Sequence, residues 1–135
     1  MRKILSAFAL LMALGGCHSF DRHLDSGHIA SDHFIDVWVD ERPVIRVSVE
    51  VLRVRGQDQV IFWRLQNASG QNYVFPDDGI FFKTNAGRAE FECRKMNPTR
   101  FRCKDKGQTK GEFHYGVKVV GTPQPPTLDP SIINH

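Results

Sequence analysis

Alternation of apolar and polar residues along positions 36–121 predicts a series of short β-strands. In residues 45–51, every second residue is isoleucine or valine and the residues between them are polar, which is the period-2 pattern of a half-buried strand. The pattern changes phase after Val51, and a β-bulge at this point would produce such a change. Residues 60–65 are apolar in both phases apart from Arg64, which is typical of a central strand covered on both sides.

Turn residues separate these strands at short intervals. Pro76-Asp-Asp-Gly79 is a strong turn signature, because proline presets φ and glycine accepts a positive φ. Further turns are expected at residues 67–70 and 85–87. Six to eight short strands without a convincing helix predict one antiparallel β-sandwich, immunoglobulin-like in the loose sense, over residues 36–121. The proline-rich residues 122–135 are expected to form an extended tail.

Residues 1–16 have the pattern of an export leader. Met1-Arg2-Lys3 is positively charged, and residues 4–14 are apolar except for Ser6. An apolar run of this length is too short to span a membrane and is typical of a secretory leader.

Leu14-Gly15-Gly16-Cys17, at the end of this leader, resembles the lipobox of bacterial lipoprotein precursors. In that class the cysteine sulfur receives a diacylglycerol, the leader is cut before the cysteine, and the new amino group is acylated. The resemblance implies that Cys17 anchors the mature chain in a membrane through acyl chains. Because His18 follows the cysteine, and not aspartate, it also implies the outer membrane of the cell envelope, with the domain facing the periplasm or the outside. The alternative is an ordinary leader with a coincidental cysteine.

Export would leave Cys93 and Cys103 in an oxidising compartment, where two cysteines ten positions apart are expected to form one disulfide. Antiparallel pairing of the two cysteines centres a hairpin turn on Pro98 and places Phe91 and Phe101 on the core face. The other face of this hairpin then pairs two glutamates with two lysines: Glu92 with Lys104, and Glu90 with Lys106. The alternative to a disulfide is a pair of metal-binding or redox thiols, although the CxxC spacing is absent.

The charge of the mature chain is close to neutral. The full chain has 18 Lys+Arg and 15 Asp+Glu, and loss of Arg2 and Lys3 with the leader leaves 16 − 15 = +1. This balance does not indicate binding to nucleic acid. No elbow motif frames a serine, and His114 is predicted on the polar face of a strand, so a hydrolytic triad is not indicated. We therefore expect a protein without enzymatic activity and without a cofactor.

Residues 17–35 are predicted to form a flexible, polar tether after the acylated cysteine. Imidazoles and carboxylates are ligands for Zn²⁺, Cu²⁺ and Ni²⁺, and both are frequent here. Four histidines recur here at every fifth position. This spacing places them on one face of neither a helix nor a strand, so only a flexible chain could bring them together around a metal ion. The tether is thus either a solvated spacer or a weak metal site. The histidines of that site would be His18, His23, His28 and His33.

Basic residues are concentrated between Arg94 and Lys110, where seven of them are accompanied by Asp105 as the one acidic residue. Like charges placed together lower stability unless a ligand offsets them. An anionic partner is therefore predicted: a lipid headgroup phosphate, lipopolysaccharide or an acidic protein patch. A solvated edge that discourages aggregation is the alternative. The residues predicted to bind the partner are Arg94, Lys95, Arg100 and Arg102.

The sequence favours a non-enzymatic outer-membrane lipoprotein whose β-sandwich contacts another envelope component. Inhibition of a secreted lysozyme or protease by the loop 95–100 is the second hypothesis. Binding of a metal or small ligand in the envelope, through the tether histidines, is the third. The ending Leu128-Asp-Pro-Ser-Ile-Ile-Asn134 resembles small bacterial β-sandwich proteins that finish with a strand and an aspartate-proline-isoleucine tail, a resemblance that implies no activity.

Overall fold

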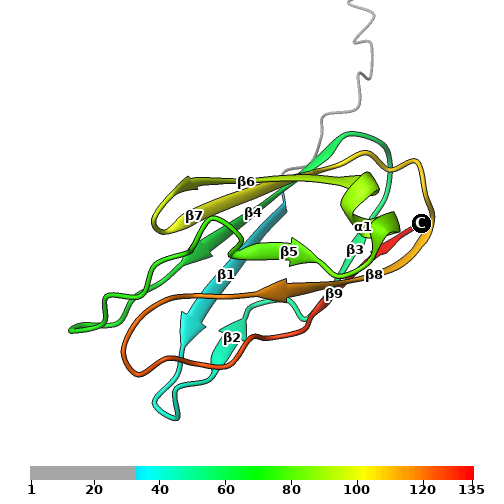
Figure 1. Ribbon diagram of the computed structural model, residues 1–135. Helices are drawn as coiled ribbons and strands as arrows, with labels where there is room; N and C mark the ends of the chain where they lie inside the picture. The colour runs from blue at the N-terminus through cyan, green and yellow to red at the C-terminus, as the bar shows by residue number, and fades with distance from the viewer. Residues whose placement is uncertain (1–32) are drawn as a thin grey trace, which may run out of the picture.

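Two β-sheets pack face to face in residues 33–135, which are the residues that the computed structural model describes (Figure 1). Five strands form the first sheet, in the order β2 (Ile45–Val47), β1 (His33–Val39), β4 (Gln59–Leu65), β7 (Arg100–Asp105) and β6 (Phe91–Asn97). Four strands form the second sheet, in the order β3 (Val51–Val54), β9 (Ser131–Asn134), β8 (Gly111–Val117) and β5 (Ile80–Phe82). The predicted β-sandwich is therefore confirmed.

The sheets are mixed and not wholly antiparallel as expected. β1 pairs with β4 in parallel, and β3 pairs with β9 in parallel, whereas the other named strand pairs are antiparallel. After β2 the chain leaves the first sheet and forms β3 in the second sheet. It then returns to the first sheet as β4, which runs in the same direction as β1. Period-2 alternation carries no information on strand direction, and a parallel pair needs only a long crossover.

The predicted bulge at Val51 is wrong, because the chain changes sheets there. β2 ends at Val47, residues 48–50 lie outside the strands, and β3 begins at Val51 in the other sheet. At this crossing the Asp36 N–H donates to the Ser48 hydroxyl at 2.9 Å, and the Ser48 N–H donates to the Asp36 carbonyl. A change of sheet shifts the phase of the apolar positions as a bulge does, since each sheet buries its own inner face.

Strands extend beyond the predicted range 36–121 at both ends. β1 begins at His33, inside the segment predicted as tether. β9 lies in the segment predicted as tail, where it pairs with both β3 and β8, and its Ile132 is fully buried. Proline cannot donate to a strand ladder, so the proline-rich part of the tail precedes this strand.

A short helix, α1 (Asn85–Glu90), replaces the turn predicted at residues 85–87. Thr84 is its N-cap, and the Thr84 hydroxyl accepts a hydrogen bond from the Gly87 N–H at 3.0 Å. Six residues make fewer than two turns, which is too short for a 3.6-residue period to be visible in the sequence. Within residues 33–135, no helix is long and apolar enough to cross a membrane.

The inner faces of the two sheets form one core. Trp63 of β4 and Tyr115 of β8 are fully buried, their rings meet edge to face at 5.5 Å, and the Trp63 indole N–H donates to the Tyr115 hydroxyl. This contact joins the sheets and satisfies two polar groups, and burial raises the pKa of the Tyr115 phenol. On the outer face of β4, Val60 and Phe62 are only half-buried, so this strand is not covered on both sides as predicted.

Two buried carboxyl groups, Asp105 and Glu90, join the ends of β7 and α1. The Asp105 Oδ1 accepts hydrogen bonds from the Gly107 N–H at 2.9 Å and from the Asn134 amide at 3.0 Å. The predicted register of Glu90 with Lys106 is confirmed, because the Lys106 N–H donates to the Glu90 carbonyl at 3.1 Å. Their charges do not pair as predicted, because Glu90 is buried and its Oε1 accepts from two successive N–H groups of the β7–β8 loop. Burial raises the pKa of Asp105 to about 6, and the nearby Glu90 carboxylate acts in the same direction.

The raised pKa of Asp105 predicts a loss of stability between about pH 4 and about pH 6. The folded state binds the carboxyl proton more tightly than the unfolded state, so protonation of Asp105 contributes to the free energy of unfolding. This contribution is complete below the unfolded-state pKa of 3.8 and is lost as the pH rises through the folded-state pKa of about 6. We expect Asp105→Asn to remove the loss, up to about 3 kcal/mol, because asparagine stays neutral. Denaturant unfolding of both proteins at about pH 4.5 and about pH 7.5 measures this difference. Identical pH dependence of the two proteins would contradict the prediction.

Candidate functional site

The hairpin of β6 and β7 contains the predicted disulfide. Cys93 lies opposite Cys103, and the two are joined by an S–S bond. Phe91, Phe101 and Cys103 are buried in the core, which confirms the predicted inner face. The register changes once, close to the tip. The hairpin therefore has one inner face in the core and one outer face toward solvent.

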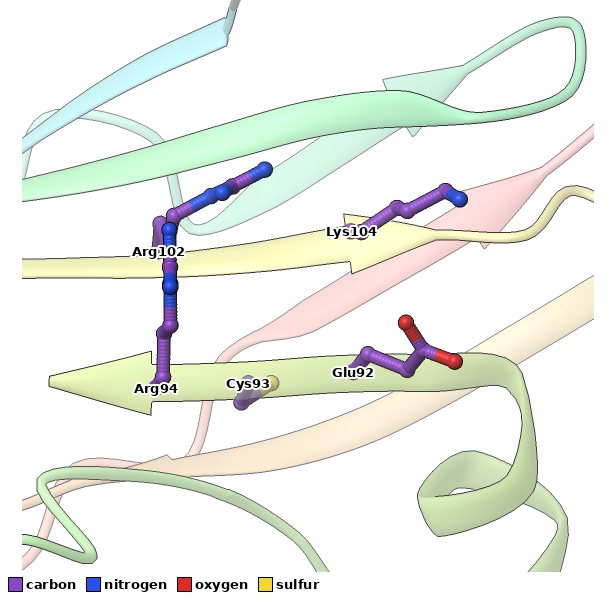
Figure 2. Close-up of a pocket in the computed structure, with 5 residues that line it drawn as sticks. All are labelled: Glu92, Cys93, Arg94, Arg102 and Lys104. Carbon is purple, nitrogen blue, oxygen red and sulfur yellow. The ribbon is translucent and has the colours of Figure 1, made fainter.

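The outer face of the hairpin places two arginines opposite each other. Arg94 of β6 pairs in register with Arg102 of β7, and Glu92 pairs with Lys104 one step along. Figure 2 shows the Arg94 side chain extended across the hairpin toward Arg102, with Lys104 and Glu92 beside them. These four residues and Cys93 line a hollow of about 320 Å³. The hollow thus has two guanidinium groups on its wall.

The lysines near this hollow are occupied by acidic partners. Lys104 Nζ lies 3.3 Å from an Asp58 carboxylate oxygen, and Lys106 Nζ lies 3.4 Å from a Glu92 oxygen. The predicted register of Glu92 with Lys104 is confirmed, but their charges are paired elsewhere. Asp58 follows β3 in the chain, and only the packing of β4 beside β7 brings it to Lys104.

The outward phase of the hairpin continues across β4 and β1. Arg64 of β4 lies opposite Arg100 of β7, and Phe62 lies opposite Arg102. On the other side of β4, Phe62 pairs with Phe34 of β1, and their rings stack with centres 5.3 Å apart. We name this surface the arginine face, and it consists of Phe34, Phe62, Arg64, Arg94, Arg100 and Arg102.

Three of the four arginines on the arginine face have no acidic partner within residues 33–135. Arg64 is the exception, because its Nε lies 2.9 Å from an Asp36 oxygen and its guanidinium lies 5.0 Å from the centre of the Phe34 ring. Like charges opposite each other on neighbouring strands lower stability, and the face contains two such pairs. The arginines without an ion pair in the described part of the chain are Arg94, Arg100 and Arg102.

Lys95 was predicted to join these arginines, but it lies on the other face of β6. It pairs in register with the buried Phe101, and its Nζ lies 4.0 Å from an Asp77 oxygen. Successive residues of a strand point to opposite faces, so Lys95 cannot share the face of Arg94. Arg64 is the residue that the sequence reasoning missed. Its signal was a single charged residue within the apolar run 60–65.

Most of the predicted metal site lies outside the described residues, as do Cys17, His18, His23 and His28. His33 is the first residue of β1, and its Nε2 is buried without a hydrogen-bond partner among residues 33–135. No group of three or more histidine, cysteine, aspartate or glutamate side chains in that part of the chain could hold a metal ion. The described residues therefore contain no complete metal site.

His114 is exposed on β8, and its Nε2 lies 3.8 Å from a Glu112 oxygen. Ser131 of β9 lies opposite His114 in register, but no hydrogen bond joins the two side chains within the described part of the chain. A histidine activates a serine nucleophile through such a bond. His114 and Ser131 lack this hydrogen bond in the described part of the chain.

Removal of the disulfide is expected to lower the free energy of unfolding by about 2–3 kcal/mol, because the bond closes a short loop in the unfolded chain. The variant Cys93→Ala/Cys103→Ala tests this, with denaturant unfolding as the measurement. Reduction of the wild-type protein is the control and should produce a loss of similar size. A variant as stable as the oxidised wild type would show that the register is held without the bond.

Replacing an unpaired arginine is expected to leave the protein as stable or to stabilise it. Arg102→Thr should raise the free energy of unfolding by about 0.2–1 kcal/mol at low salt, since it removes repulsion with Arg94 and threonine suits a strand. The gain should shrink in about 1 M salt, where charges are screened. Lys106→Thr, which breaks a surface ion pair with Glu92, is the matched control and should give no gain. If Arg102→Thr lowered the free energy of unfolding by more than the control does, the prediction would be wrong and the fold would need this arginine.

Comparison with known proteins assigns no role to the arginine face. No protein-family model matches this chain, and no curated protein shows significant sequence similarity to it. The function is therefore argued from the residues and the geometry described above.

Proposed function

We propose that this protein is a non-enzymatic lipoprotein of the cell envelope whose β-sandwich binds an anionic partner through the arginine face. The observation that carries the proposal is Arg94 opposite Arg102, on the outer face of the β6–β7 hairpin, without a carboxylate partner among residues 33–135. Repulsion between the two guanidinium groups is relieved when a negative group lies between them. Guanidinium groups also form strong, often bidentate hydrogen bonds with phosphate and carboxylate.

The backbone beneath the arginine face supports binding because its strands are paired within one sheet, and β6 at the sheet edge is joined to β7 by the disulfide. β7 pairs with β4 and with β6, and the disulfide lies on the inner side of the same hairpin. A partner therefore has to order only the arginine side chains and not the strands. Such preorganisation lowers the entropy lost on binding.

The anchor in this proposal comes from the lipobox resemblance of Leu14-Gly15-Gly16-Cys17. Acylation of Cys17 holds the protein on the outer membrane, since several acyl chains bind a bilayer stably where a single chain does so only marginally. The sandwich then presents its arginine face to other components of the envelope.

The inhibitor hypothesis has less support from the geometry of the hairpin tip. The Pro98 carbonyl accepts a hydrogen bond from the Phe75 N–H at 2.8 Å, and the Thr99 carbonyl accepts one from the Leu65 N–H at 2.9 Å. An inhibitory loop offers its backbone to a protease, whereas these two carbonyls are already used within the domain. The tether-metal hypothesis has one residue, His33, within the described part of the chain.

Binding of tripolyphosphate to the acylated protein in neutral detergent tests the proposed function. We expect calorimetry at low salt to detect binding, and Arg94→Thr/Arg102→Thr to weaken it by roughly tenfold or more, because charge-assisted hydrogen bonds are lost. Arg55→Thr/Lys110→Thr is the matched control, because it removes the same charge from residues outside the arginine face. Equal weakening in both variants, or no binding by the wild type, would refute a site at the arginine face.

The anchor is tested separately by cell fractionation. The wild-type protein is expected in the membrane fraction, and Cys17→Ser is expected to prevent acylation and processing at this site. Wild-type protein without an acyl mass on Cys17 would remove the lipoprotein part of the proposal and leave the binding part intact.

A further inference from the structure

Exposed aromatic side chains lie on the same sheet face as the unpaired arginines. Phe34 is 49% exposed and Trp38 is 38% exposed, and they are the exposed large aromatic residues within residues 33–135. Both belong to β1 and share its outward phase, since the residues between them alternate in burial. The ribbon in Figure 1 shows β1 next to β4 in the first sheet, so Trp38 continues the arginine face from Phe34 toward the sheet edge at β2.

The packing within this surface brings aromatic and cationic groups into contact. Phe34 stacks on Phe62, and the Arg64 guanidinium lies over the Phe34 ring with its carbon 5.0 Å from the ring centre. Trp38 lies opposite Arg46, whose charge is paired with Asp40. Aromatic rings beside arginines are suited to the membrane interface, where rings enter the headgroup layer and guanidinium groups meet phosphates.

We propose that the arginine face, together with Trp38, docks the domain onto the anionic lipid surface of the membrane that carries its anchor. Arg94, Arg100 and Arg102 contact lipid phosphates, and Phe34 and Trp38 enter the headgroup region. This inference rests on the proposed function, and it names a phosphate-bearing bilayer as the anionic partner. A single patch that combines unpaired cations with exposed aromatics is better matched by a bilayer than by an acidic protein surface, which offers charge without an apolar layer.

The position of the surface in the chain is consistent with contact to the anchoring bilayer. Phe34 follows Cys17 by 17 positions, so it can lie at most about 60 Å from the anchor. β1 is also the first strand of the sandwich, and Phe34 is its second residue. A basic patch adds a second membrane signal to the acyl chains, and two signals together give stable, oriented attachment.

The two tryptophans allow the docking to be measured on the acylated full-length product. Trp38 lies on the proposed docking surface, whereas Trp63 is fully buried in the core. The test compares the protein reconstituted into vesicles of brominated phosphatidylglycerol and phosphatidylcholine with the protein in vesicles of brominated phosphatidylcholine alone. The anchor holds the protein on both vesicles, so any difference in tryptophan quenching reports docking of the domain.

On the anionic vesicles we expect a loss of roughly half of the Trp38 emission, because an interfacial depth of about 5–10 Å brings the ring near the bromine atoms. The quenching should be absent on neutral vesicles and in about 1 M salt. Trp38→Phe should remove the quenched component, and Arg94→Thr/Arg102→Thr should abolish quenching while Arg55→Thr/Lys110→Thr retains it.

Quenching of equal size on neutral vesicles, or quenching that persists in Arg94→Thr/Arg102→Thr, would overturn the proposal, because the contact would not depend on the arginines. Absence of quenching on anionic vesicles would also overturn it. If tripolyphosphate still bound in that case, the proposed function would stand and the partner would be an anionic molecule other than the bilayer. If tripolyphosphate failed to bind as well, both would fall.

Discussion

The register of strand β7 is the constraint on which the rest of the structure depends. Cys103 lies opposite Cys93 on one neighbour and opposite Ile61 on the other, so three strands share one inward phase. A slip of one residue would turn Phe101 and Cys103 toward solvent and carry the neighbouring arginines into the core. The disulfide and the burial of apolar side chains oppose that slip together. The core and the arginine face are therefore two consequences of the same pairing.

This pairing also explains how the sandwich tolerates unfavourable charges at two places. On the outer face, Arg94 and Arg102 repel each other in solvent, where repulsion is weak compared with the apolar burial on the inner side of the same strands. At the end of β7, Asp105 is buried beside Glu90, where desolvation raises the pKa of the Asp105 carboxyl. The first arrangement is open to a ligand. The second is buried, and its charge depends on the pH.

Local patterns predicted the hairpin well, because register, disulfide and inner face all depend on residues close together in the chain. Lys95 differs because proximity in the chain does not imply a shared surface: alternation along β6 sends Lys95 and Arg94 to opposite faces. The sheet change after β2, the short α1 and the late strand β9 were missed for a related reason. The elements β3, α1 and β9 have only four to six residues each, which is too few to show a clear hydrophobic period in the sequence. β9 also directly follows a proline-rich segment.

The sequence by itself determined the β-sandwich class, the pairing of Cys93 with Cys103 and the expectation of a lipid anchor at Cys17. These follow from period-2 alternation and from motifs that are complete within a few residues. Only the tertiary structure decided that Arg64 and Phe34 lie on one surface with Arg94 and Arg102. That surface requires the strand order β1-β4-β7-β6, with a parallel step between the first two strands. Strand order is set by long-range packing of whole sheets, and local periodicity carries no record of it.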